Sequence, residues 1–304
     1  MKQNTLGALI QKTRENRKIS KVALCHGLCT ITALTRYELD IRIPDKFLTD
    51  ALLQRLGINP FQFEFISSDQ EFMYSMKRTE LEKLLYHNEI EKALIILNEY
   101  GEEIKDNDFL HNQYILLIKA IIHGKQAEYN KAIFLLQQAL EYTKCNYDHF
   151  GKTDNMLLTD IEIRIIYMLA KYLYCEGKTT ESYSKFNALK QYINKMNWDK
   201  EKYKEYYPHI LYRLSQQEID LYNWGTAYNY LNEAEKILIQ NYKLDNLYEI
   251  LELKDYVLTQ MSIDERSCDN ADFILALKII STSINGKITK EGIALWENTA
   301  NHPL

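Results

Sequence analysis

Apolar residues in this chain recur three or four positions apart, the spacing that places them on one face of an α-helix. In the first 60 residues this pattern predicts four short helices, near residues 6–17, 21–28, 31–39 and 47–57. From about residue 71 onward it predicts longer helices separated by short breaks. Only ten glycines and four prolines occur in 304 residues, so few β-turns are available. The sequence therefore predicts an all-α protein.

The second and third of these helices are expected to form a helix-turn-helix. Ser20 and Thr30 stand just before them, and both residue types cap helix N-termini. The second helix is expected to turn Val22 and Leu24 toward a core, and a turn of about four residues separates it from the third. We call residues 1–66, which hold this motif, the head.

The head is basic, whereas the rest of the chain is acidic. The first 65 residues hold ten Lys and Arg against six Asp and Glu, a surplus of four positive charges. Because the whole chain carries a net charge of -5, the remainder carries -9. This asymmetry favours a nucleic-acid contact confined to the head. A surplus of four is modest, so we expect a homodimer that sums the phosphate contacts of two heads.

The third helix is positioned to read double-stranded operator DNA. The N-terminal half of a recognition helix points at base edges in the major groove, which here presents Thr32, Ala33 and Arg36. Leu34 and Tyr37 are expected to pack into the core of the head. Flanking polar residues are expected to contact phosphates. The full predicted set of DNA-contacting residues is Arg14, Lys21, Thr30, Thr32, Ala33, Thr35, Arg36 and Arg42.

This stretch resembles the Xre/Cro/C1-type helix-turn-helix family over about the first 60 residues. The matching residues, in the family's order, are Leu6-Gly7-Ala8-Leu9-Ile10, Arg14, Ser20-Lys21-Val22-Ala23-Leu24, Thr30, Leu34-Thr35-Arg36-Tyr37-Glu38, Pro44 and the run 48–56. Two positions depart from the family. Lys21 replaces a glutamine and can hold a phosphate as a point charge. Ile31 replaces another glutamine and can pack on a thymine methyl.

Residues 71–304, which we call the array, contain four similar segments that each begin near a small residue. These residues are Ala93, Ala132, Ser182 and Ala227, and they lie 39, 50 and 45 positions apart. Antiparallel helices approach most closely where side chains are short. The segments therefore predict degenerate tetratricopeptide-like helical hairpins that stack into a right-handed superhelix with a concave face. A capping helix is expected over residues 288–300.

The first helix of each hairpin is expected to line the concave face. These helices are predicted near residues 72–85, 109–123, 156–175, 203–223 and 247–261. Asn and Gln side chains on them suit an extended peptide, because an amide can satisfy both backbone N–H and C=O groups. The same residue types also occupy ordinary solvated surfaces. The predicted peptide-contacting residues are Gln113, Arg164, Tyr167, Lys171, Arg213, Gln216, Gln217, Asp220 and Asn223.

A helix-turn-helix joined to such an array resembles the peptide-responsive regulators of the Rgg/PlcR-like (RRNPP) group. The resemblance covers the whole chain in architecture, but at the level of motifs it covers only the head. It implies an intracellular quorum-sensing receptor that binds a short signalling peptide in the concavity. It also implies dimerisation through the array and peptide control of operator binding or polymerase recruitment.

The sequence contains no recognisable catalytic motif, so we expect no enzyme and no cofactor. Gly151-Lys152-Thr153 and Gly177-Lys178-Thr179 resemble the end of a phosphate-binding loop, but the glycine required five residues earlier is Asn146 or Tyr172. Seven histidines and five cysteines form no metal-binding spacing, and the cysteines are expected in the core. The sequence shows neither a membrane span nor a signal pattern, so a cytoplasmic location is expected.

Two other functions fit the same sequence. In the first, the array is a scaffold that grips a partner protein and the head no longer binds DNA. In the second, the concavity holds a small molecule instead of a peptide. Salt separates DNA binding from the scaffold hypothesis, because phosphate contacts weaken steeply with ionic strength.

Overall fold

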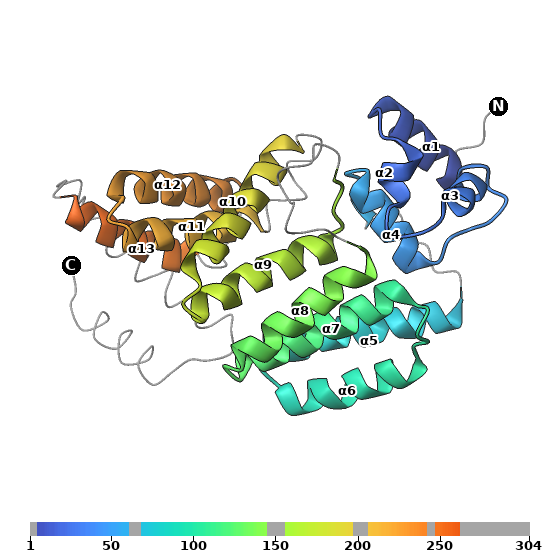
Figure 1. The fold of residues 1–304 in the computed structure, drawn as a ribbon, viewed down its shortest axis with the longest axis horizontal. Helices are drawn as coiled ribbons and strands as arrows, with labels where there is room; N and C mark the ends of the chain where they lie inside the picture. Colours follow the sequence, from blue (N-terminus) through green and yellow to red (C-terminus); the bar gives the residue numbers. More distant parts are fainter. Residues whose placement is uncertain (1–4, 61–67, 145–155, 197–205, 242–246, 262–304) are drawn as a thin grey trace, which may run out of the picture. The chain divides into compact units, whose positions relative to one another are not determined.

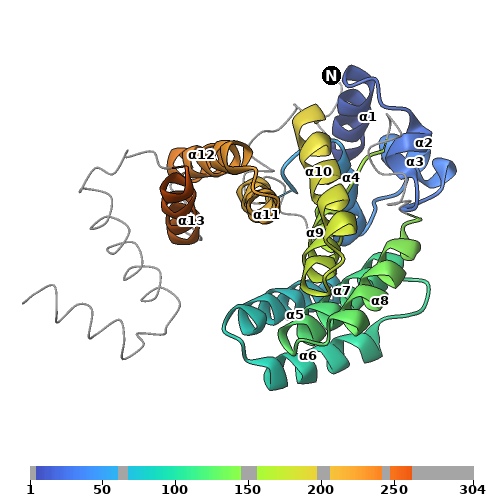
Figure 2. The ribbon, with the colours of Figure 1, turned by 60° about the vertical axis from the view of Figure 1, so that its left-hand side comes forward.

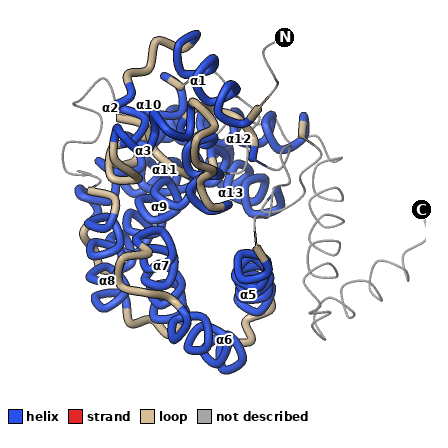
Figure 3. Tube along the Cα trace, turned by 90° about the vertical axis from the view of Figure 1, so that its right-hand side faces the viewer, coloured by secondary structure: helices blue, strands red, loops and turns tan. Residues whose placement is uncertain are grey.

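The computed structural model describes residues 5–60, 68–144, 156–196, 206–241 and 247–261, and these residues form thirteen α-helices and no strand (Figure 3). The all-α prediction is confirmed for this part of the chain. The helices are α1 (Leu6–Asn16), α2 (Lys21–Cys25), α3 (Ile31–Glu38), α4 (Lys46–Arg55), α5 (Asp69–Tyr86), α6 (Ile90–Glu103), α7 (Phe109–Lys125), α8 (Tyr129–Tyr142), α9 (Asp160–Cys175), α10 (Thr179–Lys195), α11 (Tyr207–Asp220), α12 (Trp224–Gln240) and α13 (Leu247–Gln260). The expected capping helix at 288–300 lies outside the described residues.

The head consists of α1 to α4 around a small apolar core. Ser20 and Thr30 cap α2 and α3 as predicted, each accepting the N–H of the residue three positions on. Leu34 and Tyr37 are buried in this core. Val22 is not, because the short helix α2 turns only Leu24 and Cys25 inward and leaves Val22 exposed.

The array is built from hairpins whose turns repeat one backbone conformation. Asn88, Ala127, Gly177 and Tyr222 each end a hairpin's first helix with a positive φ, near +59°, +60°, +77° and +60°. They lie 39, 50 and 45 positions apart, the same intervals that the sequence predicts for the repeats. The left-handed conformation lets the chain reverse at the end of a helix.

A small buried residue follows each of these turns by five positions. Ala93, Ala132, Ser182 and Ala227 are fully buried, as expected where two antiparallel helices approach closely. The hydroxyl of Ser182 donates to the carbonyl of Ala170 on the facing helix at 2.8 Å, which satisfies the one polar member of the set.

The chain divides into two compact units, residues 1–202 and 203–304. The first unit holds the head and the hairpins α5/α6, α7/α8 and α9/α10, the first two of which pack side by side (Figure 2). The second holds α11, α12 and α13, which pack in sequence. Within the first unit α4 lies against the N-terminal end of α9 (Figure 1). The head thus packs against the array's first hairpins, because Leu110 of α7 joins its core.

None of the helices in the described ranges is both long and apolar enough to cross a lipid bilayer. Cys25 is buried as expected, whereas Cys175 is exposed at the end of α9, because the chain turns there. Gly177-Lys178-Thr179 forms the turn between α9 and α10. Its glycine is explained by the positive φ of +77° that this turn requires, without any phosphate-binding role.

Candidate functional site

Helix α3 presents a short polar surface to solvent. The Thr30 hydroxyl accepts the N–H of Ala33 at 3.1 Å and fixes the start of the helix. Thr32 and Arg36 are exposed, and Ala33 lies half-buried between them. Ile31 is also exposed, so an apolar side chain stands beside the polar ones. A helix anchored by its cap and its buried face, with its N-terminal half exposed, has the form that enters a major groove.

Arg14 does not belong to this surface. It is only 8% exposed, and its Nε donates to Glu38 Oε1 at 2.6 Å while Nη1 donates to the carbonyl of Ile19 at 3.2 Å. The guanidinium of Arg14 is therefore buried and paired with Glu38, so it is not available to contact a phosphate, which corrects the prediction. The inward position of Glu38 was not predicted, although it stands four residues after the buried Leu34 and so shares that residue's face of α3.

Lys21 and Arg42 keep positions at the edge of α3. The Lys21 ammonium lies 3.0 Å from both the Thr35 hydroxyl and a Glu38 oxygen, so it links α2 to α3. Its side chain is still partly exposed. Arg42 is exposed in the connection between α3 and α4, and its backbone N–H donates to the carbonyl of Arg36. Both cations flank α3, the helix that carries the exposed Arg36.

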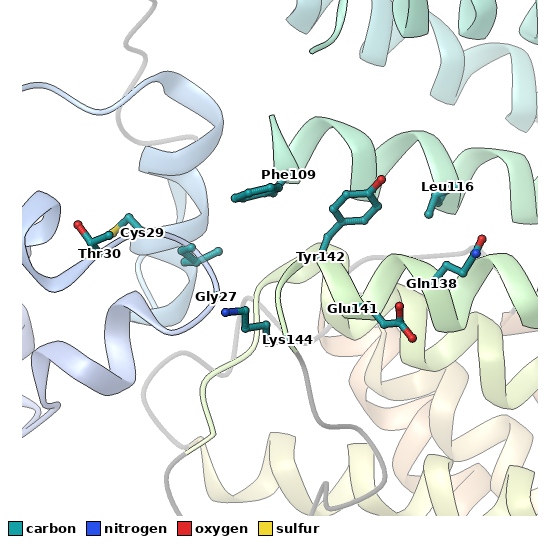
Figure 4. Close-up of a pocket in the computed structure, with 10 residues that line it drawn as sticks. Gly27, Cys29, Thr30, Phe109, Leu116, Gln138, Glu141, Tyr142 and Lys144 are labelled. Atoms are coloured by element: carbon teal, nitrogen blue, oxygen red, sulfur yellow. The ribbon is translucent and has the colours of Figure 1, made fainter. Parts of the chain in front are cut away.

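The turn of the helix-turn-helix lines a pocket of about 690 Å³ that it shares with α7 and α8 (Figure 4). Phe109 and Tyr142 form its aromatic wall, with ring centroids 6.5 Å apart. Cys29 and Thr30 line the pocket from the head. Burial raises the pKa of the Cys29 thiol to about 12, so this side chain stays protonated and acts as part of the apolar lining.

The predicted peptide-contacting residues of the first unit differ in their exposure. Gln113 is fully buried, and its amide donates to the Ala139 carbonyl and the Thr143 hydroxyl. It ties α7 to α8 and is thereby unable to meet a ligand, which corrects the prediction. Arg164 forms a two-pronged ion pair with Glu82 of α5.

Two further members of that set lie on α9. The Tyr167 ring packs edge-on against Phe186 of α10, with centroids 5.7 Å apart, and remains half-buried. Lys171 lies four residues further along and is also half-buried. Both side chains therefore keep part of their surface accessible on α9, the helix that also carries Arg164.

The second unit holds the other five predicted residues, on α11 and at its end. Arg213 donates to the Gln216 amide oxygen at 2.8 Å, and both side chains are half-buried. Gln217 is buried on α11, so little of its side chain is accessible to a ligand, and we correct the prediction for it. Asp220 and Asn223 are exposed around the turn between the two helices.

No protein-family model and no curated protein matches the sequence. A solved structure of PlcR from Bacillus thuringiensis, in complex with the peptide PapR7 and DNA, matches 99% of this chain and 100% of its own, with a TM-score of 0.57 and 13% identity. The chain has the fold of PlcR. The resemblance that the sequence indicates is thus confirmed for the fold, which places a helix-turn-helix before an array of helical hairpins.

Two other solved structures match with lower scores. ComR from S. thermophilus, in complex with DNA and its signalling peptide ComS, matches 83% of this chain and 99% of its own, with a TM-score of 0.39 and 12% identity. The SHP pheromone receptor Rgg2 from Streptococcus dysgalactiae matches the same shares, with a TM-score of 0.33 and 12% identity.

Proposed function

We propose that this protein is a transcription regulator of the Rgg/PlcR-like group, whose head binds operator DNA and whose array binds a short signalling peptide. The observation that carries the proposal is the surface of α3, where the capped helix exposes Thr32 and Arg36. The PlcR fold supports it, because PlcR was solved with both a peptide and DNA. The proposed working division of the chain is residues 1–66 for DNA and residues 71–304 for the peptide and for dimerisation.

The proposed DNA contacts follow from exposure. Arg36 reads a base edge, together with Thr32 and the methyl group of Ala33. Lys21, Thr30, Thr35 and Arg42 contact phosphates around the helix. Arg14 is left out because its guanidinium is buried against Glu38. Since the head carries a surplus of only four positive charges, two heads of a homodimer bind two half-sites.

The proposed peptide contacts are the accessible polar side chains of the hairpins' first helices. They are Arg164, Tyr167 and Lys171 in the first unit, and Arg213, Gln216, Asp220 and Asn223 in the second. Regulation requires the peptide to bind one arrangement of the dimer more tightly than another, because equal affinity for both shifts nothing. Asn223→Ala is therefore expected to leave basal DNA binding unchanged and to weaken the response to peptide.

The experiment that tests the proposal is titration of fluorescent duplex DNA, taken from upstream of the protein's own coding sequence, at several salt concentrations. We expect selective binding that weakens steeply with salt and a loss of about tenfold or more in Arg36→Ala, since a bidentate base contact contributes about 1–3 kcal/mol. Lys236→Ala removes an exposed cation from α12 and serves as the charge-matched control. Normal operator affinity in Arg36→Ala contradicts the proposed role of α3.

A further inference from the structure

Arg55, the last residue of α4, ties the head to the array. Its Nη1 donates to the carbonyls of Leu24 and His26, at 3.2 and 2.5 Å, and its Nη2 donates to both carboxylate oxygens of Glu162, at 3.2 and 3.3 Å. The two charged side chains are only 2% and 1% exposed. A buried charge that loses its partner is strongly destabilising, so this ion pair stays closed while the first unit is folded.

Glu162 is itself fixed to the first turn of α9. The Thr159 N–H donates to its carboxylate at 2.7 Å, and the Glu162 N–H donates to the Thr159 hydroxyl at 3.2 Å, which together make a capping box. The next N–H, that of Asp160, donates to the side chain of Gln54 on α4 at 3.1 Å. The carboxylate that holds Arg55 therefore moves only when the start of α9 moves.

The turn of the helix-turn-helix also rests on the end of α8. Gly27 has a φ of +67°, and a Cβ at this position would overlap the carbonyl oxygen of Thr143. His26 Nε2 lies 3.3 Å from the carbonyl oxygen of Lys144. The end of α8 and the start of α9, consecutive elements of the array, thus both hold the residues that lead into α3.

We infer that Arg55 and Glu162 are positioning residues for the DNA-reading helix, and that α9 is the element through which the array controls the head. This inference rests on the proposed function. The Arg55 guanidinium holds the carbonyls of Leu24 and His26, and Thr30, four residues after His26, caps α3. The start of α9 therefore sets where α3 begins.

The same helix carries Tyr167 and Lys171, which are accessible further along α9. A helix moves as one rigid element, so a ligand that displaces α9 at these residues displaces Glu162 as well. Linkage also runs in the other direction: DNA that favours one position of α3 must favour the matching position of α9. This reciprocity allows a test that needs DNA and no peptide.

The test is amide hydrogen exchange on the full chain, with and without duplex DNA that the protein itself has selected from a random pool. The amides of residues 159–163 report on the capping box and on the contact with Gln54. We expect bound DNA to slow their exchange by about threefold or more. In Glu162→Gln, which keeps an acceptor for Thr159 but loses the negative charge that pairs with Arg55, this effect of DNA is expected to disappear.

Lys77→Gln is the matched control, because it breaks a partly exposed ion pair with Glu103 in the same unit. It is expected to leave the effect of DNA on residues 159–163 intact. If DNA binds with the expected salt dependence and these amides do not respond, the inference is overturned and the proposed function stands. If no selected DNA binds, both fail. Should Glu162→Gln not fold, the response of the unaltered chain decides between these outcomes.

Discussion

The guanidinium of Arg14 on α1 donates to both carboxylate oxygens of Glu38 on α3, at 2.6 and 3.2 Å, inside the head. Lys21 on α2 adds a second cation to the same carboxylate at 3.0 Å. One buried acidic group therefore holds α1, α2 and α3 of the head together. The sequence predicts a phosphate contact for both Arg14 and Arg42. The structure buries Arg14 and leaves Arg42 exposed beside α3.

Arg14→Ala is expected to destabilise the head by about 3 kcal/mol, because it leaves the carboxylate of Glu38 buried with one cation fewer. Arg42→Ala is expected to leave stability unchanged. It is expected to reduce the slope of log affinity against log salt concentration by the amount that corresponds to about one phosphate contact. Urea unfolding and DNA titrations across salt measure the two effects. A lower salt dependence in folded Arg14→Ala, with unchanged stability, contradicts this assignment.

Gln113 is expected to matter for stability and not for ligand binding. Gln113→Ala removes the donor to the Ala139 carbonyl and the Thr143 hydroxyl in a fully buried site, so a loss of about 2 kcal/mol is expected. Gln216→Ala is the comparison, because that half-buried side chain is expected to change stability by less than about 0.5 kcal/mol. Thermal unfolding of both variants tests this, and equal losses argue against it.

Tyr222 occupies the turn position that corresponds to Asn88, Ala127 and Gly177 in the other three hairpins. Its side chain is 78% exposed and its φ is +60°, a conformation that costs a bulky residue about 1 kcal/mol. Tyr222→Gly is therefore expected to raise the free energy of unfolding by about that amount. Gly177→Ala, where a Cβ meets no other atom, is expected to lower it by a similar amount. Opposite signs in urea unfolding confirm backbone strain as the cause.

Stability is expected to fall as the pH drops from about 6.5 to 4, in part because of His111. Burial, and after it the nearby Arg78, lowers the pKa of this imidazole to about 4, although Asp108 and Glu71 act in the opposite direction. The unfolded chain binds a proton near pH 6.5. The folded state does not bind it until about pH 4, so the contribution is complete above 6.5 and is lost below it.

His111→Asn tests this pH dependence. The asparagine amide keeps a polar partner for the Tyr100 hydroxyl, which lies 2.5 Å from His111 Nδ1, but does not titrate. Unfolding free energies measured between pH 4 and 7 are expected to show a shallower slope in the variant by as much as one proton. The same slope in both proteins assigns the acid sensitivity to other groups.

The sequence by itself determined the helices and their order, because these depend on local patterns. Apolar residues three or four positions apart predict α3 and the hairpins, and Ser20 and Thr30 mark helix starts through bonds to their own neighbours. The repeat interval was also readable, since Ala93 and Ala132 are small for a reason that acts within each hairpin.

Only the tertiary structure decided which polar side chains face outward. Arg and Gln are residue types that usually lie on the surface, yet Arg14 and Gln113 are buried. Their hydrogen-bond partners, Glu38 and Ala139, lie 24 and 26 positions away in the sequence. The contact of Arg55 with Glu162 spans 107 positions and joins two elements with no shared local pattern. Such contacts depend on how helices pack in space, because a buried charge is stable only beside a partner that packing brings to it.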